Sequence, residues 1–122
     1  MVDIPALRRI AAALPGAHDA CTDARLAFEV GGKGFAWSFL ERLHPKKPRV
    51  PSLEALAVRC PMERKEFLVE AAPDIYFDDD HYRGYPAVLV RLDAIGEAEL
   101  AALLADACAW QASRPSRRRK KP

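Results

Sequence analysis

The sequence predicts an α+β domain in which helices pack on one face of an antiparallel sheet. Apolar residues recur at helical spacing in residues 4–14 and 97–112, near the two ends of the chain. Between them, residues 25–39 alternate in the pattern of half-buried strands. The expected strands follow one another in meander order, without the helical crossovers of βαβ units, and this order favours an antiparallel sheet.

The first and last helices have recognisable ends. The first is expected to begin after Asp3, a good N-cap residue, and to end at Pro15-Gly16. The last is expected to begin at Gly96, where Glu97 and Glu99 place negative charge near the positive end of the helix dipole. It runs to about residue 112, and Trp110 is expected to pack near its core face.

A second helix is expected between Pro61, which can open a helix, and Pro73, which stops one. Its apolar side is expected to consist of Phe67, Leu68 and Ala71. Its solvated side is expected to consist of Glu63, Arg64, Glu66 and Glu70.

The strands are expected around a tight hairpin. Residues 17–23 are interpreted as a short polar linker that leads into a strand over residues 25–30. Gly31-Gly32 can adopt the positive φ angles of a two-residue turn, and a second strand follows over residues 35–39. Residues 44–51 contain three prolines, which cannot donate to a strand ladder, so they are expected to form a loop. Further strands are expected at residues 56–60, 75–77 and 87–92.

The length and composition indicate one soluble domain. The chain has 122 residues, of which 50% are hydrophobic and 30% charged. No run of about 18 apolar residues is present, so no membrane contact is expected. The first residues lack the basic segment and apolar stretch of a secretory signal, so the cytoplasm is the expected compartment. We expect a monomer.

The positive charge is concentrated in the last nine residues. The net charge is +2, yet six lysines and arginines and no acidic residue lie in residues 114–122. The remaining 13 positive and 17 negative residues give residues 1–113 a net charge of −4. We therefore expect a mildly acidic folded domain over residues 1–113 and a basic, disordered tail over residues 114–122.

No catalytic, cofactor or metal motif is apparent. Cys21, Cys60 and Cys108 are far apart, and no CxxC pair exists. No serine hydrolase, zinc protease or phosphate-loop motif is present, so neither an enzyme nor a cofactor is expected. Residues 78–81, Asp-Asp-Asp-His, carry metal-ligating types, but adjacent residues cannot all converge on one ion. We expect a solvated turn there and no metal site.

Five segments resemble the MmcQ/YjbR family when taken in order. They are Leu-Pro-Gly-Ala at 14–17, Phe-Glu-Val-Gly-Gly-Lys-Gly-Phe-Ala at 28–36, Ala-Pro-Asp at 72–74, His-Tyr-Arg-Gly-Tyr-Pro at 81–86 and Leu-Leu-Ala-Asp-Ala at 103–107. The resemblance implies a CyaY-like fold. It also implies DNA binding through a double-wing motif, which is how members of the family are described. It implies no catalytic residues.

Nucleic-acid binding is the leading functional prediction. Lys33 lies at the expected hairpin tip, and Lys46, Lys47 and Arg49 lie in the next loop. If these loops are neighbours, they can contact phosphates as two wings without reading sequence. Further phosphate contacts are expected in the tail from Arg117, Arg118, Arg119 and Lys120. The alternative is that these lysines belong to ordinary surface loops, which the acidic balance of residues 1–113 favours.

The runner-up is a binding site for a small anionic ligand or a protein partner in the Tyr82-Arg83-Gly84-Tyr85 loop. An arginine between two tyrosines can hold a carboxylate or phosphate, and the rings can stack on a flat group. His81 precedes the motif, and Trp37 is expected on the same face. The alternative is that Arg83 pairs with the preceding aspartates while the tyrosines cover the edge of the sheet.

Overall fold

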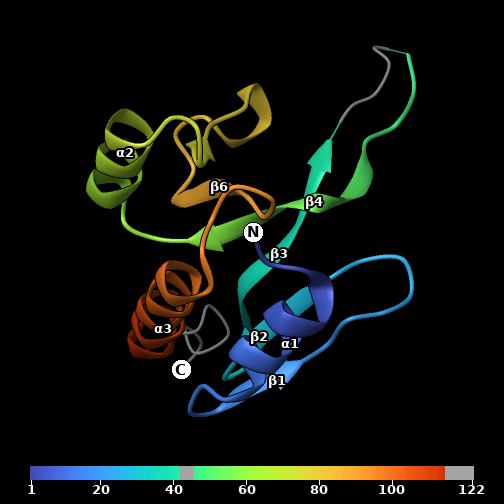
Figure 1. Ribbon diagram of the computed structural model, residues 1–122, viewed down its shortest axis with the longest axis vertical. Helices are drawn as coiled ribbons and strands as arrows, with labels where there is room; N and C mark the ends of the chain where they lie inside the picture. Colours follow the sequence, from blue (N-terminus) through green and yellow to red (C-terminus); the bar gives the residue numbers. More distant parts are fainter. Residues whose placement is uncertain (42–45, 115–122) are drawn as a thin grey trace, which may run out of the picture.

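The fold is α+β, as expected. The computed structural model describes residues 1–41 and 46–114. Its helices are α1 (Ile4–Ala12), α2 (Met62–Ala71), the short 3-10 helix η1 (Asp80–Tyr82) and α3 (Glu97–Ser113). Its strands are β1 (Ala17–Asp19), β2 (Ala27–Val30), β3 (Lys33–Glu41), β4 (Val50–Arg59), β5 (Tyr76–Phe77) and β6 (Ala87–Arg91). In the described part of the chain these strands form one antiparallel sheet in the order β1-β2-β3-β4-β6-β5 (Figure 1).

The first helix begins and the first hairpin turns at the residues that the sequence predicted. The Asp3 carboxylate accepts a hydrogen bond from the Ala6 amide at 2.9 Å, so Asp3 is the N-cap of α1. Gly31 and Gly32 have φ angles of 59° and 78° and form the turn between β2 and β3. A side chain at either position would be strained, which explains the glycine pair.

The expected linker after α1 contains a strand. Residues 17–19 form β1, which pairs antiparallel with β2 and is an edge of the sheet. Three residues are too few to show a clear alternation, so the sequence pattern did not reveal this strand. The interpretation of residues 17–23 as a simple linker is therefore wrong.

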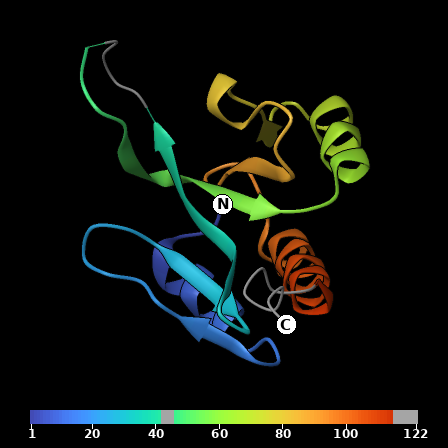
Figure 2. The ribbon, with the colours of Figure 1, turned by 180° about the vertical axis from the view of Figure 1, so that it is seen from behind.

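Strand β4 begins earlier than expected and forms a projecting ribbon with β3. Val50 pairs with Glu41, and Pro51 pairs with Leu40. On the N-terminal side of Ala55, β4 no longer pairs with β6. Only β3 and β4 remain there, and they form a two-stranded ribbon (Figures 1 and 2). Pro51 is tolerated because β4 has a single neighbour at that point. The expectation that residues 44–51 are all loop is therefore wrong for its last two residues.

The main core lies on the helix-covered face of the sheet. Leu7 of α1, Leu68 of α2 and Leu104 of α3 all belong to one buried cluster with the inner residues of the strands. A bulge opposite Phe28 and Glu29 places the adjacent residues Phe35 and Ala36 in this same cluster. All three α-helices therefore pack on one face, as the sequence predicted.

A second, smaller core covers the opposite face. It is built from Phe39, Ala55, Ala57, Tyr82, Ala87 and Leu89, with Trp37 and Phe77 packed against it. The ring centroid of Phe39 lies 5.6 Å from that of Phe77 and 5.8 Å from that of Tyr82. The segment that contains η1 thus closes this face in place of a helix.

The buried side of α2 differs from the expected one. Phe67 is 60% exposed, whereas Lys65 is only 2% exposed and lies on the same helix stripe as Leu68. This helix packs against the η1 segment as well as the sheet. The backbone carbonyls of Tyr82 and Tyr85 face its buried side, and Lys65 donates hydrogen bonds to both. The expectation that Phe67 belongs to the apolar side is therefore wrong.

None of the described helices has the combination of length and apolar character that a membrane crossing requires.

Replacement of Phe28 by alanine is expected to lower the free energy of unfolding by about 2–4 kcal/mol, because the ring is 1% exposed and fills the main core. The matched control is Phe67→Ala on α2, for which a change below about 0.5 kcal/mol is expected. Urea unfolding followed by circular dichroism measures both. Equal losses in the two variants would contradict the assigned strand register.

Acid is expected to loosen the contact between α1 and β1. Arg8 Nε donates to Asp19 Oδ2 at 2.9 Å, and this hydrogen bond lowers the pKa of Asp19 from its ordinary 3.8 to about 2. The contribution of the pair is therefore complete above the ordinary pKa and is lost as the pH falls through about 2. Urea midpoints measured from neutral to acid pH should fall less steeply in Asp19→Asn. Identical pH profiles for the variant and the wild type would contradict the coupling.

Candidate functional site

The two basic loops lie at opposite ends of β3. Lys33 is the first residue of this strand, whereas Lys46 and Lys47 follow its far end. Nine residues of strand span about 27 Å, so the two groups cannot grip one phosphate segment together. Figures 1 and 2 show the β2–β3 turn and the projecting ribbon on opposite sides of the molecule. The condition for two wings, that these loops are neighbours, is therefore not met.

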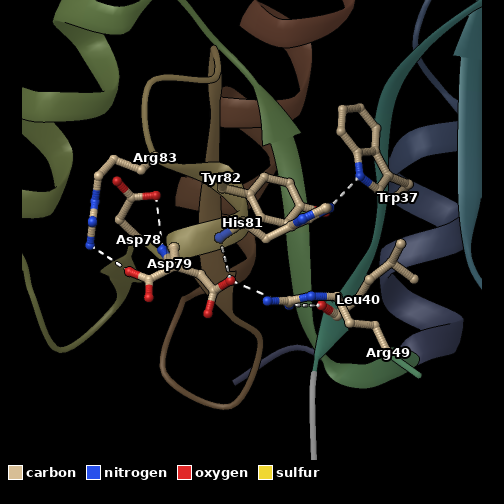
Figure 3. Close-up of polar contacts among 9 residues, drawn as sticks. Trp37, Leu40, Arg49, Asp78, Asp79, His81, Tyr82 and Arg83 are labelled. Atoms are coloured by element: carbon tan, nitrogen blue, oxygen red, sulfur yellow. Dashed lines mark hydrogen bonds and ion pairs between the residues drawn. The ribbon is translucent and has the colours of Figure 1, made fainter. Parts of the chain in front are cut away.

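Lys33 and Arg49, which were predicted to bind phosphates, contact backbone carbonyls of the protein itself. The Lys33 ammonium donates to the backbone carbonyl of Arg114, just past the end of α3, where a cation is favourable. Arg49 Nη1 donates to the Leu40 carbonyl at 2.7 Å and lies 3.3 Å from Asp79 Oδ2 (Figure 3). Both cations therefore stabilise the fold.

The remaining predicted phosphate contacts differ in how far the structure describes them. Lys46 and Lys47 are exposed in the connection between β3 and β4. Arg117, Arg118, Arg119 and Lys120 lie outside the described residues. At the start of the tail, the guanidinium carbon of Arg114 lies 4.6 Å from the centroid of the Trp110 ring.

The three consecutive aspartates take three different partners. Asp78 pairs with Lys65 at 3.1 Å, Asp79 with Arg49, and Asp80 with Arg83. Asp79 also accepts from the backbone amide of His81 at 3.0 Å, as Figure 3 shows. Among the described residues, no group of three or more His, Cys, Asp or Glu is arranged to hold a metal ion.

The Tyr82-Arg83-Gly84-Tyr85 segment does not form the predicted clamp. Tyr82 is 4% exposed, and its hydroxyl accepts from Trp37 Nε1 at 3.1 Å (Figure 3). Arg83 turns to the Asp80 carboxylate at 2.6 Å, and both side chains are mostly exposed. His81 is exposed, with its ring edge-on to Tyr82. The arginine therefore does not lie between the tyrosines, and Tyr82 and Trp37 are packing residues of the second core.

Lys65 is a structural residue that sequence reasoning missed. Its ammonium donates to the carbonyls of Tyr82 and Tyr85 at 2.6 and 2.9 Å, in addition to its ion pair with Asp78. Three acceptors offset the cost of burying this charge. The available signal was its position three residues before Leu68, on the buried stripe of α2.

Arg59, the last residue of β4, is the second residue that was missed. Its guanidinium carbon lies 4.9 Å from the centroid of the Tyr85 ring. Among the described residues of the predicted clamp, Tyr85 is thus the one whose ring has an arginine over it. That arginine is Arg59 of β4, and not Arg83 of the clamp itself.

The thiols are unsuited to nucleophilic chemistry. Burial raises the pKa of Cys60 to about 11, and burial also raises the pKa values of Cys21 and Cys108. All three are therefore protonated at neutral pH, whereas nucleophilic attack requires the thiolate.

Comparison with known proteins gives the family. A family model described as YjbR matches residues 12–111. The chain belongs to the YjbR family. This YjbR chain is 37% identical over 92 residues to uncharacterized proteins Mb2600 of Mycobacterium bovis and Rv2570 of Mycobacterium tuberculosis, with 70% of this chain and 71% of each relative covered. Its fold is similar to that of the Deinococcus radiodurans protein DR2400, whose description names the domain DUF419. That match has a TM-score of 0.63 at 24% identity and covers 88% of this chain and 76% of the other.

Replacement of Lys65 by methionine is expected to lower the free energy of unfolding by about 2–4 kcal/mol, because two carbonyls and one carboxylate lose their donor. The matched control is Glu66→Met, the exposed neighbour on the same helix, with an expected change below about 0.5 kcal/mol. Chemical unfolding gives the free energies. Near-ultraviolet circular dichroism should also change for Lys65→Met, since Tyr82 and Tyr85 lose their anchor. A methionine variant as stable as the wild type would contradict this role.

Proposed function

We propose that this YjbR protein is a nucleic-acid-binding accessory module that acts as a cytoplasmic monomer and contacts phosphates without reading sequence. The observation that carries the proposal is the two-stranded β3–β4 ribbon, which projects beyond the sheet and leads to the exposed residues Lys46 and Lys47 (Figure 1). A two-stranded ribbon fits the major groove of duplex DNA, and lysines near its end reach the backbone.

The paired end of the ribbon is braced against the rest of the protein, which limits the entropy lost on binding. Arg49 joins β3, through the Leu40 carbonyl, to Asp79 in the segment over the second core. The ribbon pairs Glu41 with Val50. A braced ribbon presents its lysines with little reorganisation, and preorganisation of this kind favours affinity.

The charge distribution restricts the proposed contact surface. Residues 1–113 carry a net charge of −4, so most of the domain surface repels a polyanion. The ribbon and the basic tail are therefore the two proposed contact regions, and they meet the nucleic acid at separate places. With so few phosphate contacts, binding is expected to be weak and strongly salt-dependent.

Ligand binding within the Tyr82-Arg83-Gly84-Tyr85 loop has less support. Arg83 is paired with Asp80, and Tyr82 is buried in the second core. The proposal therefore rests on charge at the ribbon and tail.

Removal of the ribbon lysines is expected to reduce the salt dependence of binding. Fluorescence anisotropy with labelled duplex and single-stranded DNA is measured for the full chain and for Lys46→Ala/Lys47→Ala at several salt concentrations. Each phosphate contact contributes about 0.9 to the magnitude of the slope of log K against log salt. The loss of two contacts should therefore lower this magnitude by about 1.8. The matched control is Arg9→Ala/Arg25→Ala, which removes the same charge from exposed positions elsewhere.

A chain that ends at Arg114 separates the ribbon from the tail. We expect weakened but measurable binding that still depends on Lys46 and Lys47. Equal slopes for the two double variants would contradict a role for the ribbon, and no binding of the full chain at low salt would overturn the proposed function.

A further inference from the structure

A cavity of about 280 Å³ is lined by the end of β4, the start of α2 and one side of α3. Its lining includes Arg59, Cys60 and Arg64 on one side and Leu103, Asp106 and Trp110 of α3 on the other. This volume is at the lower end for small-molecule sites, and it suits a ligand with one ring. The cavity lies away from the ribbon and uses none of the residues assigned to nucleic-acid contact.

The guanidinium of Arg59 is not satisfied by the protein. Its Nε and Nη1 atoms are buried and have no hydrogen-bond partner among the described residues. The Tyr85 ring stands 4.9 Å from the guanidinium carbon and offers a π face, but it carries no negative charge. Buried donors are almost always paired, so two unpaired nitrogens at a cavity wall indicate a missing acceptor.

Arg64 adds a second cation to the lining of the cavity. It lies in the first turn of α2 and is exposed, and neither it nor Arg59 forms an ion pair with a described carboxylate. The N-cap of this ten-residue helix is Pro61, which makes no side-chain capping bond. Pro61 also lines the cavity, so the positive end of the α2 dipole lies at this wall, where Glu63 of the first turn offsets part of it.

The opposite wall, formed by α3, is mainly apolar and carries one acidic residue. Trp110 is half-buried, with the Arg114 guanidinium carbon 4.6 Å from its ring centroid, and it lines the cavity together with the buried Leu103. Sequence reasoning placed Trp110 in core packing, whereas the structure places it at a cavity. Asp106 is exposed on the same helix, so the formal charges of the cavity-lining residues Arg59, Arg64 and Asp106 sum to +1. This balance favours a monoanion over a multiply charged phosphate.

We propose that this cavity binds a small aromatic carboxylate. Arg59 and Arg64 hold the carboxylate, because a guanidinium matches its two oxygens. The ring lies against Trp110 and Leu103, and Asp106 accepts a hydrogen bond from an amine or hydroxyl on the ring. The Cys60 thiol, protonated at neutral pH, contributes apolar contact and leaves the ligand unmodified.

Titration of the full chain with defined probes tests the ligand class. The probes are benzoate, 4-aminobenzoate, the neutral isostere benzamide, and inorganic phosphate, followed by amide chemical shifts in NMR. Saturable shifts at residues 59–64 and 103–110 are expected for both carboxylates, with 4-aminobenzoate the tighter. Benzamide should bind at least about tenfold more weakly than benzoate, since it lacks the charge. Tighter binding of phosphate than of benzoate would overturn the carboxylate assignment, and the absence of saturable shifts for every probe would overturn the site.

Matched variants test the residues. Arg59→Gln should weaken 4-aminobenzoate binding at least about tenfold. Arg91→Gln is the control, because the Arg91 guanidinium carbon lies 4.3 Å from the Phe77 ring centroid in a similar stacked arrangement outside the cavity. Arg64→Gln removes the exposed cation without a buried change and should also weaken binding. Equal affinities for Arg59→Gln, Arg64→Gln and the wild type would refute the proposed contacts.

Thermal unfolding distinguishes a binding role from a structural role for Arg59. Arg59→Met removes the unpaired nitrogens and keeps an apolar stem over Tyr85, so its melting temperature without ligand should equal or exceed that of the wild type. It should also lose the rise in melting temperature that 4-aminobenzoate gives the wild type. A large drop in melting temperature without ligand would show that Arg59 acts structurally. DNA binding should be unchanged in this variant, so the two proposed functions fail independently.

Discussion

The buried ammonium of Lys65 is the interaction on which the second half of the fold depends. It donates to the Tyr82 and Tyr85 carbonyls and pairs with Asp78, and so joins α2 to the whole segment between β5 and β6. A lone buried charge is costly, and only the convergence of three acceptors makes this one favourable. The segment has little regular structure, so this anchor adds to the packing of Tyr82 and the Asp79–Arg49 ion pair in holding it over the sheet.

Two features of the molecule follow from the position of this segment. Tyr82 closes the second core against Phe39 and Trp37. Tyr85, three residues later, places its ring over Arg59 at the edge of the cavity between α2 and α3. The same lysine that completes the packing therefore also shapes the wall of the proposed ligand site, although it is not among the residues that line it.

Prediction from sequence succeeded where the signal was local. The Asp3 cap, the Gly31-Gly32 turn and the apolar face of α3 each depend on neighbouring residues, and all three were correct. Strand β1 and the extension of β4 to Val50 depend on pairing with distant strands, so short or proline-rich segments concealed them. The site was predicted less well than the fold, because a cation's partner is set by tertiary structure. Lysine and arginine look alike in sequence whether they face solvent, a carbonyl or a cavity.

Arg59 and Arg91 show how the same residue type can serve two purposes in one sheet. Each stacks on an aromatic ring, Arg59 on Tyr85 and Arg91 on Phe77. Arg91 is exposed to solvent and reaches the Pro73 carbonyl at 3.5 Å, so water and the backbone can satisfy it. Arg59 has two enclosed nitrogens without such a partner among the described residues. A methionine at this position would avoid that cost, and packing alone therefore gives no reason for an arginine. An acceptor that enters the cavity from outside would supply one.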